Sequence, residues 1–148
     1  MRVPIYRQLE SNDCGIACIR MISAYYGKVY SIKTLKTLCQ QTRAGISISD
    51  IVSCFEAIGF EASCVNVERK DMYRMPMPAI LYLKHGHFVV LEKIRKRHSC
   101  NIFTILDPAY GKVCLTEDKL LEIWLIAGKG VAVVMAPKSD FHKIGTVV

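Results

Sequence analysis

The segment from Gln8 to Ile22, QLESNDCGIACIRMI, places a cysteine where a thiol can act as a nucleophile. Asn12 and Asp13 are residue types that cap helix N-termini, and an apolar run follows them directly, so we expect Cys14 in the first turn of a helix. The unpaired N–H groups and the dipole of that turn favour a thiolate over a thiol. With an imidazolium beside it, such a cysteine has a pKa lowered from about 8.5 to roughly 3.5–7.5.

A thiolate nucleophile needs a base, a group that orients the base, and donors for the oxyanion that develops. His87 begins an expected strand, and Asp107 comes directly after the end of the next one. Gln8 lies six positions before Cys14, near enough for its side-chain amide to join the Cys14 backbone N–H in a two-donor oxyanion hole. Each residue also has an ordinary interpretation, since free cysteines are commonly core filler and such polar residues commonly belong to turns or the solvated surface.

A hairpin would bring two of these residues together. Strands are expected at residues 87–94 and 101–106, with the polar run 95–99 as a tip centred on Arg97. The numbers of paired residues then add up to 194, a condition that His87 and Asp107 meet. We therefore expect these two side chains opposite each other on one face, with Cβ atoms about 4.5–5.5 Å apart. A slip by one residue would move Asp107 to the other face.

Helices fill the first half of the chain and strands the second. Three helices are expected, near residues 14–27, 31–41 and 47–59. The first is apolar on nearly every side and therefore buried, and the second has an apolar stripe made of Ile32, Leu35, Leu38 and Cys39. Five strands and a late helix follow, at residues 60–67, 79–84, 87–94, 101–106 and 131–136, with the helix at 116–124. This order predicts an α+β domain with an antiparallel sheet.

Composition limits the class of protein. The 148 residues suit one domain, and no run approaches the roughly 18 apolar residues of a membrane-spanning helix. Seven cysteines, without a CxxC pair, indicate a reducing compartment rather than a disulfide framework. The net charge of +7 is mostly dispersed, and its one tight cluster, residues 95–98, is typical of a hairpin tip, so no nucleic-acid partner is expected.

A zinc site is the alternative use of the histidines and cysteines of the second half. Helix-borne HExxH and paired CxxC ligands are both missing from the sequence, so neither a metal nor another cofactor is expected. The residues that such a site could recruit are His85, His87, His98, Cys100 and Cys114.

Three separated stretches, QLESNDCGIAC, HGHFVVL and LDPAYG, resemble in sequence and order the motifs of the C39 family of cysteine peptidases. This is the papain-like domain at the N-terminus of bacterial ABC exporters that trim leaders from bacteriocins and related peptides. The resemblance implies Cys14 as nucleophile, His87 as general base and then acid, Asp107 as the group that orients His87, and Gln8 as oxyanion donor. His85 competes with His87, but the family motif falls on HFVVL.

The resemblance also implies a substrate and a setting. The enzyme would cut after a Gly-Gly or Gly-Ala pair that ends a leader, and Gly15 would leave room for the substrate backbone beside the nucleophile. The leader would bind as an amphipathic helix. Partner transmembrane and ATP-binding domains would place this soluble domain, residues 1–137, on the cytoplasmic side of the bacterial plasma membrane, with 138–148 as a tail or linker. The alternative is a docking domain that holds leaders without cutting them.

Overall fold

A computed structural model describes residues 2–10, 12–39, 45–139 and 141. Three helices come first: α1 (Cys14–Tyr25), α2 (Ile32–Cys39) and α3 (Ile48–Ala57). The second half contains six strands, the 3-10 helix η1 (Arg69–Arg74) and α4 (Glu117–Trp124). The strands are β1 (Phe60–Glu68), β2 (Ala79–Tyr82), β3 (Phe88–Arg97), β4 (Cys100–Asp107), β5 (Gly111–Thr116) and β6 (Lys129–Pro137).

The six strands form one antiparallel sheet in the order β1-β6-β2-β3-β4-β5, which confirms the predicted α+β class. The sequence analysis missed β5. Val113 and Leu115 are half-buried while Lys112, Cys114 and Thr116 are exposed, so the alternation typical of an edge strand was present in the sequence. The described helices include none long and apolar enough to cross a bilayer.

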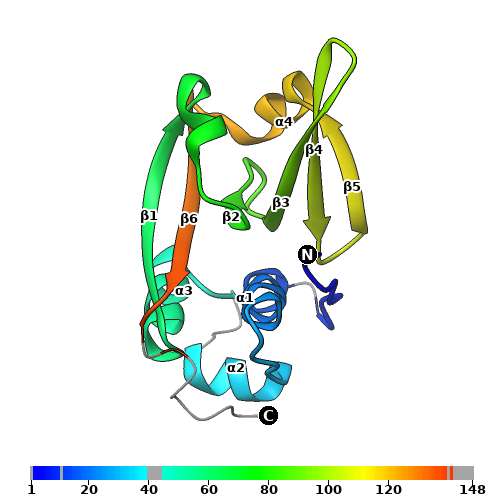
Figure 1. The fold of residues 1–148 in the computed structure, drawn as a ribbon. Helices are drawn as coiled ribbons and strands as arrows, with labels where there is room; N and C mark the ends of the chain where they lie inside the picture. Colours follow the sequence, from blue (N-terminus) through cyan, green and yellow to red (C-terminus); the bar gives the residue numbers. More distant parts are fainter. Residues whose placement is uncertain (1, 11, 40–44, 140, 142–148) are drawn as a thin grey trace.

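The helical half packs on one face of the sheet, and α1 lies between the sheet and α2 (Figure 1). Beneath these helices Phe88, Val90 and Leu106 contribute to a core that also contains the buried side of α1. The opposite face of the sheet is covered by a second core that includes Trp124 of α4. The packing of α1 on the sheet places the first turn of α1 next to the start of β3.

Helix ends follow the predicted capping chemistry with one exception. Ser31 Oγ accepts the Thr34 N–H at 3.1 Å, and Ser47 Oγ accepts the Asp50 N–H at 3.1 Å. Asp13 is the N-cap of α1, but its side chain makes no capping hydrogen bond. Its buried carboxylate instead pairs with Lys36 of α2 at 3.2 Å, which ties the start of α1 to the neighbouring helix.

The apolar stripe of α2 is narrower than predicted. Ile32, Leu35 and Cys39 are buried, but Leu38 is 42% exposed, so its assignment to the stripe was wrong. The reason is the helical period, which rotates Leu38 away from the face shared by the other three residues. The predicted end of this helix, near residue 41, lies outside the described residues.

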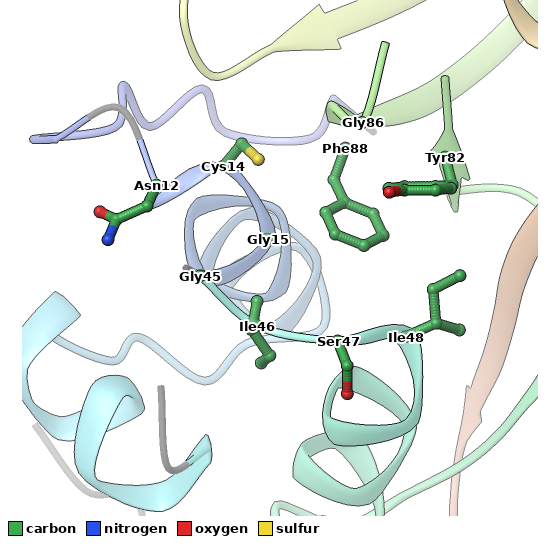
Figure 2. Close-up of a pocket in the computed structure, with 10 residues that line it drawn as sticks. All are labelled: Asn12, Cys14, Gly15, Gly45, Ile46, Ser47, Ile48, Tyr82, Gly86 and Phe88. Atoms are coloured by element: carbon green, nitrogen blue, oxygen red, sulfur yellow. The ribbon is translucent and has the colours of Figure 1, made fainter. Parts of the chain in front are cut away.

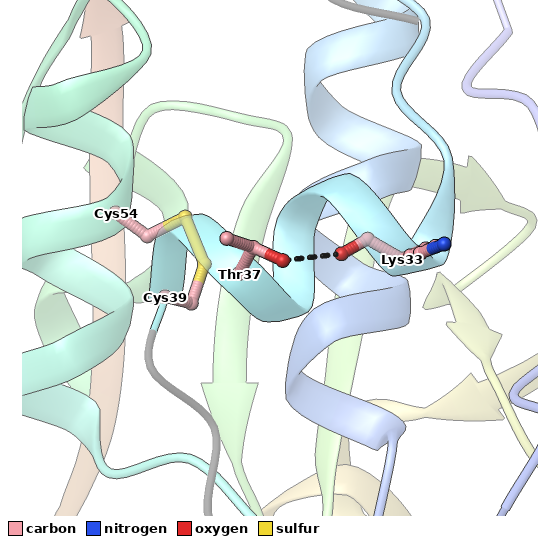
Figure 3. Close-up of a disulfide and its surroundings, with 4 residues drawn as sticks. All are labelled: Lys33, Thr37, Cys39 and Cys54. Carbon is pink, nitrogen blue, oxygen red and sulfur yellow. Dashed lines mark hydrogen bonds between the residues drawn. A yellow bond between two sulfur atoms is a disulfide. The ribbon is translucent and has the colours of Figure 1, made fainter.

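A disulfide joins Cys39 of α2 to Cys54 of α3 (Figure 3). The prediction that all seven cysteines are reduced thiols was therefore wrong for these two. Both residues lie in the core as apolar positions of their helices, and consecutive helices bring their Cα atoms to 5.1 Å. Sequence spacing alone carries no signal for that contact, because it arises from helix packing.

The hairpin of β3 and β4 differs from the predicted register. The turn consists of His98 and Ser99 alone, with His98 at φ +50°. The numbers of two paired residues near the tip therefore add up to 197, as for Arg97 and Cys100. A bulge at Glu92 then changes the sum to 196, as for Val90 and Leu106. The predicted sum of 194 was therefore wrong.

The bulge has a consequence for the two polar residues at the open end. Without the bulge the numbers of paired residues would still add up to an odd number. The numbers of His87 and Asp107 add up to an even one, so the two side chains would then lie on opposite faces of the sheet. With the bulge the sum is even, and the two residues share a face two positions out of direct register. The expected contact is kept, as a diagonal instead of a directly opposed pair.

Candidate active site

Cys14 is the first residue of α1 and is 8% exposed. Its sulfur contacts the start of β3, where it accepts hydrogen bonds from the Phe88 backbone N–H and the His87 side chain, and it also accepts from the Gly15 N–H. α1 holds this position firmly because its side chains are buried along most of its length. The nucleophile candidate is thus fixed between a helix N-terminus and a strand.

His87 is held on its other side by Asp107. The distance from His87 Nε2 to Asp107 Oδ1 is 2.7 Å, and the same oxygen accepts the Ala109 N–H at 2.8 Å. Each of the two paired side chains is only 13% exposed. With Nε2 bound to the carboxylate, Nδ1 is the ring nitrogen left for the Cys14 sulfur. The structure therefore brings Cys14, His87 and Asp107 into one hydrogen-bonded chain.

The contacts shift both pKa values toward an ion pair. The hydrogen bond with Cys14 raises the pKa of His87 to about 9, with Asp107 adding to the rise, and these contacts outweigh burial. For Cys14, burial raises the pKa, but the His87 hydrogen bond and the Phe88 N–H outweigh it, so that the pKa is lowered overall. Thiolate and imidazolium therefore stabilise each other.

Cys18, one turn further along α1, shows the opposite behaviour. It is completely buried, and burial raises its pKa well above the usual value, with the charges of Cys14 and Asp107 adding to the effect. Cys18 stays a neutral thiol at any physiological pH. The two neighbouring cysteines of the motif thus have pKa values shifted in opposite directions, and the lowered one belongs to Cys14.

Gln8 lies beside the turn that follows β4. Its backbone N–H donates to the Pro108 carbonyl at 2.9 Å, and its side-chain Nε2 donates to the Glu10 carbonyl at 2.9 Å. Because an amide Nε2 carries two N–H groups, one remains for another acceptor. Gln8 is therefore held one residue from Asp107, and its predicted role as oxyanion donor stays a prediction.

A cavity of about 390 Å³ opens beside Cys14 (Figure 2). Gly15 lines it, and a Cβ on Gly15 would lie 2.4 Å from Ile46 Cγ2, so a side chain does not fit there without displacing this wall. Only two of the lining residues, Cys14 and Gly15, were predicted from the sequence to take part in the site. The others are Asn12, Gly45, Ile46, Ser47, Ile48, Tyr82, Gly86 and Phe88.

The competing residues lie apart from this chain of hydrogen bonds. His85 is exposed in the turn before β3, and its ring stacks on that of His87 with 5.5 Å between the centroids. Cys100 and Cys114 are exposed on the β4 and β5 strands. In the described part of the chain, no three side chains of His, Cys, Asp or Glu gather as metal ligands would.

A cysteine on the first turn of a buried helix, next to a histidine paired with a carboxylate, is an arrangement that can activate a thiol as a nucleophile. Residues 2–140 match the Peptidase C39 family, and the chain belongs to this family. This confirms the resemblance seen in the sequence.

Two relatives of this chain have names that combine processing with secretion or transport. The chain is 31% identical over 150 residues to the lactococcin-G-processing and transport ATP-binding protein LagD of Lactococcus lactis, covering 95% of this chain and 20% of that protein. It is 28% identical over 140 residues to the probable microcin-H47 secretion/processing ATP-binding protein MchF of Escherichia coli, covering 95% and 19%. The chain thus spans about a fifth of the length of these relatives.

Solved structures show the same fold. A double glycine motif protease from an AMS/PCAT transporter, solved with the leader peptide, matches with a TM-score of 0.81 at 24% identity, covering 93% of this chain and 94% of that one. The peptidase domain of Streptococcus ComA matches with a TM-score of 0.79 at 22% identity, covering 92% and 99%.

Proposed function

We propose that this chain is a cysteine endopeptidase that removes the leader of a secreted peptide precursor by cutting after a Gly-Gly or Gly-Ala pair. The observation that carries the proposal is the hydrogen-bonded chain of Cys14, His87 and Asp107 beside a cavity. An inert docking domain has no need for a thiol whose pKa is lowered by an oriented histidine. No metal or cofactor takes part.

The proposed reaction is acyl transfer through Cys14. The thiolate attacks the carbonyl carbon of the second small residue, and the oxyanion is held by a Gln8 Nε2–H and the Cys14 backbone N–H. The C–N bond breaks as the His87 imidazolium protonates the leaving amine, which leaves a thioester. Neutral His87 then takes a proton from water, the hydroxide attacks the thioester, and the thiolate is released beside the imidazolium again.

The setting of the reaction is proposed from the relatives. LagD and MchF combine processing with secretion or transport by an ATP-binding protein, so we infer that the native protein includes transmembrane and ATP-binding domains and that this domain works on the cytoplasmic side of the membrane. The preference for small residues is inferred from the double glycine motif protease that shares the fold, and Gly15, which lines the cavity without a side chain, leaves room there for the substrate backbone.

The test is a cleavage assay on the chain as it stands. A precursor peptide with a Gly-Gly pair at the end of its leader is incubated with the protein, and the fragments are identified by mass. Two fragments that meet after the second glycine are expected, and replacing that glycine by valine should stop the reaction. An intact peptide that nonetheless co-purifies with the protein would replace the proposal by leader docking.

Gln8→Ala is expected to lower kcat by about 10²–10³ with little change in KM, because an oxyanion donor acts mainly in the transition state. Gln8→Glu is the matched control for shape, and it should lose at least as much, since a carboxylate repels the oxyanion. Initial rates over a range of leader concentrations separate the two constants. A rise in KM alone would make Gln8 a binding residue.

Asp107→Ala is expected to lower kcat/KM by about 10²–10⁴, because His87 loses the partner that fixes its ring. Asp107→Asn should retain much more activity, since a single amide oxygen can accept both the His87 N–H and the Ala109 N–H, as Oδ1 does now. Loss of the carboxylate also lowers the pKa of His87, so the alkaline limit of activity should move down in the Asn variant. If the Asn variant were as slow as the Ala variant, Asp107 would act through its charge.

A further inference from the structure

Glu92, outside the predicted site, is a buried acidic residue in the middle of the sheet. It is the bulged residue of β3, at the point where the pairing with β4 shifts by one position, and it is 9% exposed. Bulges re-aim side chains next to functional sites. Its carboxylate accepts the Val3 backbone N–H at 2.8 Å. A carboxylate is costly to bury and is here committed to a backbone group 89 residues away in sequence.

Val3 begins the segment that carries Gln8. Residues 2–8 contain no helix or strand, so their position depends on individual contacts. The Val3 N–H is bound by Glu92, the Arg7 side chain donates to the Ala109 carbonyl, and the Gln8 N–H donates to the Pro108 carbonyl at 2.9 Å. Two of these anchors belong to the turn after Asp107, and the third is Glu92.

We propose that Glu92 is a positioning residue of the active site, which holds the N-terminal segment at Val3 so that the Gln8 amide stays aimed at the oxyanion. The inference rests on the proposed function. The same residue occupies the bulge whose shift of register places His87 and Asp107 on one face. One insertion in β3 therefore serves two parts of the site, the orienting pair through the backbone and the oxyanion donor through the carboxylate.

Glu92→Ala is expected to lower kcat about 10-fold with KM nearly unchanged, because small misplacements of catalytic groups cost rate more than binding. Glu92→Gln is the conservative variant, and it should restore most of the rate, since its amide oxygen can still accept the Val3 N–H. Glu56→Ala is the matched control. Glu56 also accepts a backbone N–H, that of Ala62 at 3.2 Å, but it lies on α3 and outside the cavity, so kcat should stay unchanged.

A double-mutant cycle with Gln8→Ala tests whether Glu92 acts through Gln8. If it does, Glu92→Ala has no further effect on kcat once the Gln8 amide is gone. If Glu92→Ala still lowered kcat 10-fold in the Gln8→Ala protein, the positioning role of Glu92 would be wrong, while the proposed peptidase activity would stand. A wild-type protein that binds leader but never cuts it would instead remove the proposed function, and the inference with it.

Hydrogen exchange supplies a measurement that does not depend on catalysis. Glu92→Ala should raise exchange at the Val3 and Gln8 amides, with Glu92→Gln close to wild type and Cys14 to Tyr25 unchanged. Unchanged protection of Val3 in the Ala variant would contradict the anchor. A Glu92→Ala protein with uniformly raised exchange has lost its fold, and the Gln variant then decides the matter through its kcat.

Discussion

Cys14→Ala should abolish cleavage of a leader peptide and leave the binding of that peptide essentially unchanged. The thiolate forms the bond to the substrate, so no other group in the site replaces it, and losses on the order of 10⁶ in kcat are known for comparable nucleophiles. Binding should survive because alanine keeps the Cβ and removes a single small atom at an 8% exposed position on a rigid helix.

The measurement pairs a mass-based cleavage assay with binding of a fluorescent leader to both proteins. Cys18→Ala serves as the matched control, since Cys18 lies one turn away with a raised pKa and should be dispensable for chemistry. A Cys14→Ala protein that still cuts at a comparable rate would exclude Cys14 as the nucleophile. Loss of binding together with cleavage would show that Cys14 has a structural role.

Alkylation of Cys14 at low pH should depend on His87. In the wild-type protein the His87 side chain lowers the pKa of Cys14 despite burial, whereas His87→Ala removes the hydrogen bond and charge that offset burial, so the Cys14 pKa should rise above its usual value. Each unit of pKa change alters the thiolate fraction about tenfold at a pH below both values. We expect the iodoacetamide rate at pH 6 to fall by at least about 10-fold.

Three exposed cysteines must first be removed from the comparison. Cys64, Cys100 and Cys114 lie on the surface and are open to the label, so the experiment uses the background with all three replaced by serine. Equal labelling rates with and without His87 would contradict the ion pair.

The pH profile of cleavage by the wild-type protein should be flat between the pKa of Cys14 and the pKa of about 9 of His87. It should fall above pH 9 as the imidazolium loses its proton.

The site residues that the sequence was sufficient to predict are those whose position depends on local structure. Cys14 follows a helix start that is visible in NDCG, and His87 and Asp107 stand at strand ends marked by Gly86 and Pro108. The four predicted helices and five of the six strands were found, because their periodicity is strong. The domain boundary near residue 137 stays a prediction, although Phe141 beyond it packs against Phe60 with 4.8 Å between the ring centroids.

The sequence could not predict features that depend on register or on packing between distant elements. The two-residue turn at His98 and the bulge at Glu92 shift the hairpin in opposite directions, and neither is marked by glycine or proline. The Cys39–Cys54 contact and the cavity wall at Ile46 and Tyr82 likewise join segments that only the tertiary fold brings together. In the sequence such side chains look like any other apolar residues, so their contacts could not be predicted from it.

In the proposed reaction, Cys14 is a nucleophile that His87 activates and that attacks a leader ending in Gly-Gly. The most direct test is a leader peptide with a chloromethyl ketone in place of the scissile bond, followed by the intact mass of the protein and mapping of the modified residue. We predict one equivalent of peptide on Cys14, with labelling lost in Cys14→Ala and strongly slowed in His87→Ala. Peptide attached to Cys64, Cys100 or Cys114, or no adduct while the peptide still binds, would contradict the account.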